Sequence, residues 1–231
     1  MQKRTAVLYG ATGLIGKQLV RYLLESPEYS RVTAVVRRPL HLRHPNLQEV
    51  VADFDQLEKY SDLMAGDDIF CCLGTTMRKA KTKEAFRRVD FDYPLQIARI
   101  AKRNGAQKFL LVSAIGANKH SPFFYNRVKG ELEEKLAEIG FPQLLIFRPS
   151  LLLGDRKEFR LGEKSAILLS SVLSLFLIGP LQKYRAIDAE QVAYAMYRSA
   201  VKEWSQAIIV LESDQMLTSL PACHQSGGFS D

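Results

Sequence analysis

Three glycines spaced three residues apart, Gly10, Gly13 and Gly16, separate the first apolar run of the chain from a segment with helical periodicity. A helix that begins directly after a strand leaves its first N–H groups free, and its dipole attracts an anion to them. The first glycine permits a tight turn, the second permits close backbone approach to a diphosphate, and the third permits close packing of helix on sheet. The motif therefore predicts a dinucleotide phosphate site after a first strand.

Apolar runs of strand length alternate with longer segments of helical periodicity along the chain, which is typical of a parallel sheet with crossover helices. The runs are rich in Val, Ile, Leu and Phe, as expected for strands covered on both faces. We predict strands at 5–9, 32–36, 47–51, 68–72, 108–112, 144–147 and 207–211, and helices at 14–24, 56–64, 83–103, 122–139 and 189–201. The predicted fold class is α/β, with a doubly wound parallel sheet of the Rossmann type.

The region at 154–185 interrupts this alternation, and an insertion after the sixth strand of such a sheet is well placed to cover a substrate. The length of 231 residues fits one α/β domain. We expect a single domain over residues 1–218, with 154–185 as a small C-terminal substrate-covering region, and a poorly ordered tail at 219–231.

The apolar segment at 166–178 has 13 residues, whereas a helix that spans a bilayer needs about 20. We therefore predict no transmembrane segment. The segment is interpreted as a buried or pocket-covering helix, and peripheral membrane contact is the alternative.

The net charge of +7 is concentrated in two short clusters, at 37–43 and 78–88, so we expect no nucleic-acid partner. Two of the three cysteines, Cys71 and Cys72, are neighbours, and Cys223 stands alone near the C-terminus, so they predict no disulfide framework. Reduced thiols indicate a cytoplasmic protein.

The residues after the second, third and fourth strands bear on the choice of cofactor. Arg37 and Arg38 stand where an acidic residue would bind the ribose hydroxyl of NAD(H), and two guanidinium groups suit a 2′-phosphate. The pair predicts NADP(H); the alternative is that both arginines only face solvent. Asp53 is a candidate to bind the adenine amine. Leu73 and Gly74 close the fourth strand, where a small residue lets the cofactor pass close to the backbone.

A candidate catalytic set follows the fifth strand. Ser113 ends that strand, and Tyr125 and Lys129 lie four residues apart on the predicted helix that follows, so they share one of its faces. Ligands of doubly wound sheets bind beyond the carboxyl ends of the strands, where these residues fall. The alternative is a surface tyrosine and lysine that pack without reacting. No metal is expected.

The glycine motif together with Ser113, Tyr125 and Lys129 resembles the pattern of the short-chain dehydrogenase/reductase superfamily. Three longer stretches resemble its atypical branch, which contains the mammalian Tat-interacting-protein oxidoreductases and enterobacterial NAD(P)-binding proteins. They are FCCLGTTMRKAKTKEAFRRVDFDYPLQIA at 70–98, SAIGANKHSPFFYNRVKGELEEKL at 113–136 and FRPSLLLGDR at 147–156.

The resemblance spans roughly residues 4 to 200 and implies a set of NADPH contacts. The matching positions are Thr12, Gly13, Leu14, Ile15, Arg37, Arg38, Leu73, Gly74, Tyr125 and Lys129, with Leu152 and Arg160 after the sixth strand. In the implied mechanism, Lys129 favours the phenolate of Tyr125 and holds the nicotinamide ribose. Tyr125 then passes a proton to the substrate oxygen, which Ser113 hydrogen-bonds.

One position departs from the superfamily pattern: Asp90 stands where many members carry an asparagine that holds a water for proton relay. We expect an NADP(H)-dependent oxidoreductase that transfers hydride to a carbonyl compound as its small-molecule substrate. An NADP(H)-binding regulatory or sensor protein with little or no turnover is one alternative, and a nucleotide-sugar epimerase or dehydratase is another. A homodimer is left open.

Overall fold

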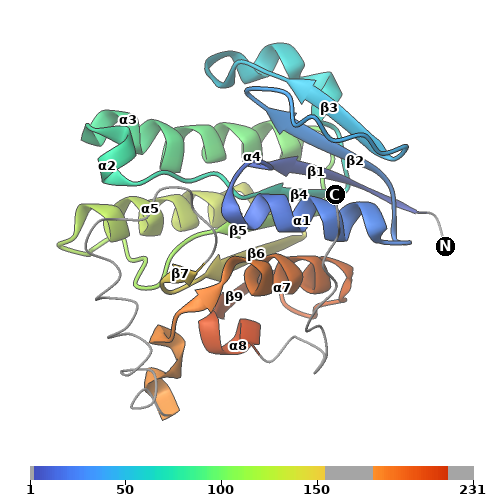
Figure 1. Cartoon of the computed structure of the whole chain (residues 1–231). Coiled ribbons are helices and arrows are strands. Elements are labelled where there is room, and N and C mark those ends of the chain that lie inside the picture. The colour runs from blue at the N-terminus through green and yellow to red at the C-terminus, as the bar shows by residue number, and fades with distance from the viewer. Residues whose placement is uncertain (1–2, 154–178, 218–231) are drawn as a thin grey trace.

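The computed structural model describes residues 3–153 and 179–217, and within these ranges seven strands form one parallel sheet (Figure 1). The strand order is β3-β2-β1-β4-β5-β6-β9, so the direction in which the chain adds strands reverses between β1 and β4. Such a switch point is where open α/β sheets bind ligands, at the carboxyl ends of the strands. The strands are β1 Arg4–Tyr9, β2 Tyr29–Val36, β3 Leu47–Val51, β4 Asp68–Cys71, β5 Lys108–Val112, β6 Gln143–Arg148 and β9 Ile208–Glu212. The predicted fold class and its seven strands are confirmed.

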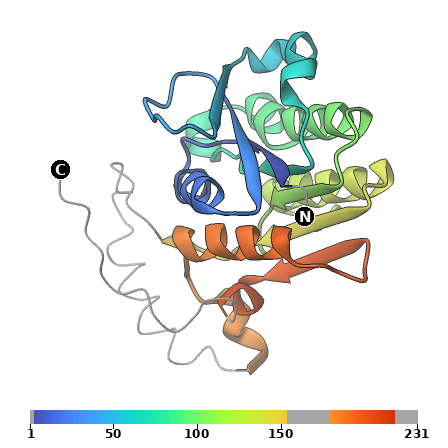
Figure 2. The same ribbon diagram turned by 90° about the vertical axis from the view of Figure 1, so that its right-hand side faces the viewer.

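Helices cover both faces of the sheet, which Figure 2 shows nearly edge-on. Helices α1 (Leu14–Glu25) and α7 (Ala189–Val201) pack together on one face. Helices α4 (Tyr93–Arg103) and α5 (Phe124–Ile139) and the 3₁₀ segment η1 (Phe54–Met64) cover the other. Each face has its own apolar core, and alternate residues of the central strands point into each. Because both faces are covered, a ligand must approach the sheet at an edge.

The predicted helix at 83–103 is interrupted. It consists of α3 (Lys83–Arg87), a π turn η2 (Arg88–Asp92) and α4. Pro94 stands at the start of α4, and a proline has no N–H to donate to the carbonyl four residues earlier and clashes with that carbonyl. That carbonyl belongs to Asp90, so the widened turn falls where the α-helical bond cannot form.

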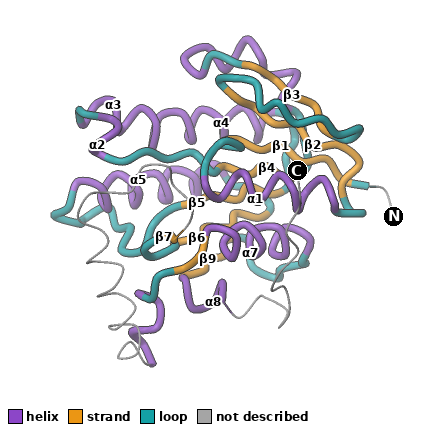
Figure 3. The backbone as a smooth tube through the Cα atoms, viewed as in Figure 1, coloured by secondary structure: helices purple, strands orange, loops and turns teal. Residues whose placement is uncertain are grey.

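Two other helix predictions differ in detail (Figure 3). The helix predicted at 56–64 is the 3₁₀ segment η1, which starts at Phe54 because the side chain of Asp53 caps it. The helix predicted at 122–139 starts at Phe124 and ends at Ile139, where Gly140 follows as the C-cap residue with a left-handed φ of +72°.

Several elements are too short to produce a periodic sequence signal. They are α2 (Met77–Ala80), α8 (Ser213–Leu217), the 3₁₀ segment η3 (Gly179–Tyr184), and the strands β7 (Leu152–Leu153) and β8 (Ile187–Asp188), which pair in parallel. Most of the predicted insertion at 154–185, including the apolar segment at 166–178, lies outside the described residues, as does the tail at 219–231. No helix in the ranges that the structure covers is long and apolar enough to cross a membrane.

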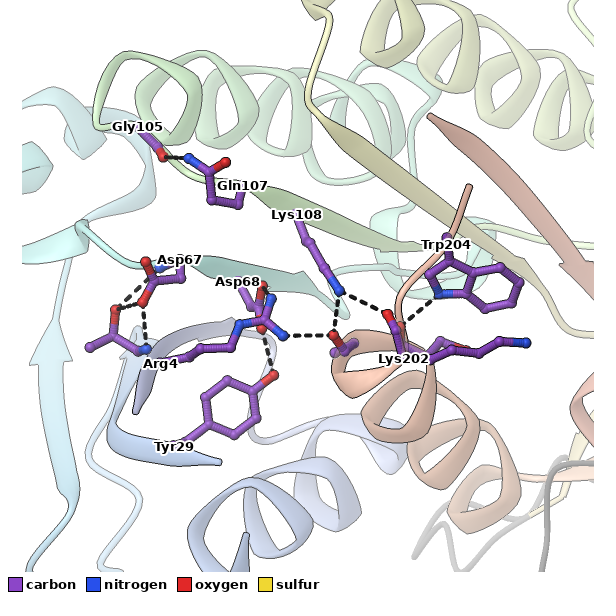
Figure 4. Close-up of polar contacts among 12 residues, drawn as sticks. Arg4, Tyr29, Asp67, Asp68, Gly105, Gln107, Lys108, Lys202 and Trp204 are labelled. Atoms are coloured by element: carbon purple, nitrogen blue, oxygen red, sulfur yellow. Dashed lines mark hydrogen bonds and ion pairs between the residues drawn. The ribbon is translucent and has the colours of Figure 1, made fainter. Parts of the chain in front are cut away.

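A polar network ties the amino ends of four strands together (Figure 4). The carboxylate of Asp68, at the start of β4, is fully buried; it pairs with Arg4 and accepts a hydrogen bond from Tyr29 Oη at 2.6 Å. Lys108 Nζ, at the start of β5, donates to the carbonyl oxygens of Ala200 and Lys202 at 2.7 and 2.9 Å. This network lies at the opposite edge of the sheet from the switch point, so we assign it to stability.

Burial raises the pKa of Asp68 to about 6, against the opposing effects of Arg4 and Tyr29. Between about pH 4 and this value the folded chain holds a proton that the unfolded chain has lost, so this group makes the protein less stable as pH rises through that window. In Asp68→Asn this pH dependence is absent. The quantity to follow is the difference in unfolding free energy between wild type and Asp68→Asn. As the pH rises from 4 to 7, we expect wild type to lose at most about 3 kcal/mol relative to the variant.

Urea unfolding at several pH values checks this expectation, with the exposed Asp62→Asn as a control. If the difference in unfolding free energy between wild type and Asp68→Asn stays constant from pH 4 to pH 7, Asp68 does not titrate in this range.

Candidate active site

The glycine motif forms the turn from β1 into α1. Gly10 has a φ of +85°, and a Cβ on it would lie 2.6 Å from the carbonyl oxygen of Cys72, which follows β4. A Cβ on Gly16 would overlap the carbonyl of Gly10. The N–H of Gly13 closes the turn on Gly10 O at 2.9 Å. The turn therefore requires glycine at its first and third positions for its own geometry, before any ligand is considered.

The backbone at the start of α1 can bind an anion. Gly13 is the N-cap residue of α1 and has no side chain to accept from the first N–H groups of the helix. Thr12 and Gly13 are exposed, whereas the side chain of Ile15 is buried in the core and that of Leu14 is half-buried. Ile15 can therefore contact a cofactor only through its backbone, which fits a phosphate seated on free N–H groups.

The two arginines predicted to select NADP(H) are both exposed after β2. Arg37 is close to Tyr93: burial and Asp55 raise the pKa of Tyr93 to about 12, and Arg37 is among the groups that oppose this rise. Arg88, from η2, opposes it as well. Positive charge from two elements thus acts on the same side chain, Tyr93.

Asp53 follows β3 and is exposed. Its Oδ1 accepts from the N–H of Asp55 at 3.0 Å and its Oδ2 accepts from Gln56 Nε2 at 2.9 Å. The side chain therefore caps η1, and each oxygen keeps a second lone pair for the adenine contact that we predicted.

The buried centre of the candidate site is an ion pair. Lys129 Nζ lies 2.8 Å from Asp90 Oδ1, and the two side chains are 3% and 1% exposed. The other oxygen of Asp90 accepts from the N–H of Thr75 at 2.8 Å. Burial lowers the pKa of Lys129, but Asp90 and Tyr125 act against burial and the net shift is upward.

Tyr125 lies one turn before Lys129 on α5, as predicted, and is 36% exposed. Its ring packs against Phe86 of α3, with the centroids 5.5 Å apart. Packing thus holds the Tyr125 side chain in place while part of it remains open to solvent. Tyr125 also raises the pKa of Lys129, one helical turn away. A pair of this kind can transfer a proton to a bound oxygen atom.

Ser113 makes no hydrogen bond to Tyr125 or Lys129 among the residues that the structure describes. Its hydroxyl donates to Glu133 Oε1, which also accepts from Arg148 Nε at 3.1 Å. Glu133 is eight residues beyond Tyr125 on α5, or about 12 Å along the helix axis. Ser113 shares the strand face of Leu111, which packs in the α5 core, so its side chain points beneath the helix. The predicted role of Ser113 on the substrate oxygen stays a prediction, and it would require the hydroxyl to leave Glu133.

The remaining predicted contacts are distributed around the same edge. Leu73 is half-buried against the core, and Gly74 is exposed directly before the backbone amide that Asp90 binds. Leu152 is half-buried in β7 and pairs with Ile187. Arg160 lies outside the described residues.

The direct partnership of Asp90 and Lys129 was missed from sequence, where Asp90 was noted only as a departure from asparagine. The sequence could have indicated this pair through charge balance, because a buried charged side chain needs a partner of opposite charge. A lysine predicted to lie on the buried side of a helix requires a carboxylate partner, and Asp90 falls within a helical segment of the adjacent crossover.

A parallel doubly wound sheet with a glycine turn at its switch point defines an NAD(P)-binding protein of the Rossmann type. Residues 10–139 match the family described as NAD(P)H-binding, and the chain belongs to this family. It is 44% identical over 167 residues to Protein HTATIP2 of Rattus norvegicus, covering 71% of this chain and 69% of that protein. It is 31% identical over 218 residues to Protein FMP52, mitochondrial, of Candida albicans, covering 91% and 95%. The predicted likeness to the atypical Tat-interacting-protein branch is confirmed.

Solved structures share the fold at low sequence identity. MoeE5 in complex with UDP-glucuronic acid and NAD superposes with a TM-score of 0.68 at 17% identity, covering 90% of this chain and 75% of that chain. A UDP-glucose 4-epimerase of Thermotoga maritima gives 0.65 at 16% identity, covering 90% and 76%. These likenesses confirm the Rossmann-type architecture.

Proposed function

We propose that the protein is an NADP(H)-dependent oxidoreductase that transfers hydride to a carbonyl substrate. One observation carries the proposal: a continuous set of contacts joins the glycine turn to the Tyr125–Lys129 pair. The turn at Gly10 packs on the backbone of Cys72, the same loop continues to Thr75, Thr75 binds Asp90, and Asp90 binds Lys129. A cofactor seated on the turn and passing along this loop would reach the tyrosine.

The residues present fit the cofactor. The exposed backbone at Thr12 and Gly13 would hold the diphosphate, and Arg37 and Arg38 would hold the 2′-phosphate. When bound, the nicotinamide supplies the hydride chemistry. Lys129 would donate to the nicotinamide ribose, and its positive charge lies one helical turn from Tyr125.

Tyr125 would act as the general acid in carbonyl reduction, giving its hydroxyl proton to the substrate oxygen. The segment at 154–185 would cover the substrate. The strands β7 and β8 flank this segment, and their parallel pairing brings its two flanks side by side.

Cofactor preference tests the first half of the proposal. We expect NADPH to bind at least about tenfold more tightly than NADH, a difference of about 1.4 kcal/mol that charge-assisted contacts supply. The double variant Arg37→Ala/Arg38→Ala should lose the preference and keep its affinity for NADH. Titration calorimetry measures both affinities, and Arg31→Ala, at the other end of β2, is the matched control. Equal affinities of wild type for NADPH and NADH would contradict the assignment.

A panel of carbonyl compounds, followed by the absorbance of NADPH, tests the second half. The second candidate function is a nucleotide-binding sensor with little turnover. The hydrogen bond from Ser113 to Glu133 favours it, because a hydroxyl that donates to a carboxylate is not free to polarise a carbonyl. A chain that binds NADPH and reduces no compound in the panel would support the sensor. A nucleotide-sugar epimerase or dehydratase ranks third, because the insertion is small for a nucleotide-sugar substrate.

For the compartment, we propose the cytoplasm, on the ground that Cys71 and Cys72 are free thiols. Cell fractionation distinguishes it from mitochondria, the compartment in the name of the FMP52 relatives.

A further inference from the structure

The widened turn η2 puts an acidic residue where the surrounding elements meet. Asp90 is 1% exposed and lies between the loop that follows β4 and α5. Single π turns within helices are often found at functional sites. Here the turn places one carboxylate within reach of two elements that are distant from it in sequence.

Each oxygen of Asp90 has a separate partner. Oδ1 pairs with Lys129 Nζ at 2.8 Å, and Oδ2 accepts from the N–H of Thr75 at 2.8 Å. A Cβ on Gly74 would lie 3.5 Å from Oδ1, so the loop approaches the carboxylate closely. The side chain therefore joins the loop that would carry the cofactor to the helix that carries the proton-transfer pair.

Three titratable groups face Lys129: Asp90 from η2, Tyr125 from α5 and Cys71 from β4. Burial raises the pKa of Cys71 to about 11, so that thiol supplies no charge at neutral pH. Asp90 is therefore the anion that balances the buried ammonium group of Lys129. A buried charge without its partner is strongly destabilising.

We propose that Asp90 is a positioning residue. Its carboxylate keeps Lys129 charged and in place, and it holds the Leu73–Thr76 loop close to Lys129. Cofactor binding then depends on a carboxylate that need not touch the cofactor. This inference rests on the proposed function for its cofactor. It assigns to Asp90 a direct ionic role, in contrast to the water-holding asparagine expected at its position.

The test begins without any cofactor. In Asp90→Asn the side-chain oxygen can still accept from Thr75, but Lys129 loses its counter-ion while burial continues to lower its pKa. The pKa of Lys129 in the folded variant then lies below the ordinary lysine pKa of about 10.4. Between these two pKa values the folded variant binds fewer protons than its unfolded chain, so its stability rises with pH. We expect the urea midpoint of the variant to lie below that of wild type at pH 7, and this deficit to shrink at least about twofold by pH 10.

The second measurement is the dissociation constant of NADPH at pH 7. We expect it to rise about tenfold or more in Asp90→Asn, or about 1.4 kcal/mol. The matched control is Asp92→Asn, in the same π turn but exposed, which should leave both the midpoint and the affinity close to those of wild type.

A double variant keeps the inference testable if Asp90→Asn does not fold. Asp90→Asn/Lys129→Met removes both charges and keeps a long unbranched side chain, so the midpoint should recover toward wild type while NADPH binding stays weak. A deficit that is constant with pH, an unchanged NADPH affinity in Asp90→Asn, or a double variant as unstable as the single one would each overturn the inference. If wild type itself binds no NADPH, the proposed function fails, and the cofactor-free unfolding data alone decide whether Asp90 holds Lys129.

Discussion

Replacing Tyr125 by phenylalanine is expected to lower kcat for carbonyl reduction by about 100-fold or more, the usual scale for losing a positioned acid. The substitution removes one hydroxyl group and keeps the ring that packs against Phe86. The side chain is partly exposed, so no buried polar group is left without a partner. We therefore expect the unfolding midpoint to be unchanged and the dissociation constant of NADPH to stay within about threefold of wild type.

The measurement is steady-state kinetics with any compound that the carbonyl panel identifies, together with NADPH titration. Tyr22→Phe is a matched control, because it also removes one tyrosine hydroxyl, here bonded to Glu190 between α1 and α7 on the other face of the sheet. A Tyr125→Phe protein with wild-type kcat would exclude Tyr125 as the proton donor.

The ion pair changes what a substitution of Lys129 can show. Lys129→Ala would leave Asp90 buried without its partner, and breaking a buried pair in this way costs about 3–5 kcal/mol. Lost activity in that variant would therefore not separate catalysis from folding. Tyr125→Phe does not have this ambiguity, which makes it the sharper test of the mechanism.

Gly13→Val is expected to raise the dissociation constant of NADPH by about 100-fold or more, equivalent to about 2.7 kcal/mol, without unfolding the protein. Gly13 is exposed and has a φ of −78°, a value that any residue adopts. Among the residues that the structure describes, a Cβ there would meet only the carbonyl oxygen of Gly10, at 3.2 Å. The added isopropyl group would instead occupy the space through which a diphosphate approaches the start of α1.

Circular dichroism and urea unfolding check the fold of this variant, and calorimetric titration checks its affinity. Gly16→Val is an informative contrast, because its Cβ would overlap the backbone of the turn, so that variant should lose stability as well as binding. Wild-type affinity for NADPH in Gly13→Val would mean that the phosphates bind elsewhere.

Local patterns were sufficient for most of the architecture. The bounds of β3, β5 and α7 agree with those predicted, and the glycine turn lies between β1 and α1. These features depend on contacts close in sequence: a strand covered on both faces must be apolar throughout, and a tight turn must use glycine. The same kind of reasoning placed Tyr125 and Lys129 on one helix face, because they are one turn apart.

The partners of the buried polar groups were decided only by the tertiary structure. Lys129 pairs with Asp90, and Ser113 donates to Glu133. Each of these contacts joins two residues that are 20 or more positions apart, so it depends on how a helix packs on the sheet and on the rotamers that this packing allows. The sequence by itself determined the Rossmann-type fold and the edge at which a nucleotide binds, since periodicity and glycine spacing are local properties. Which side chains meet at that edge was decided by packing, since a buried charge or hydroxyl takes the partner that the folded core brings within hydrogen-bond distance.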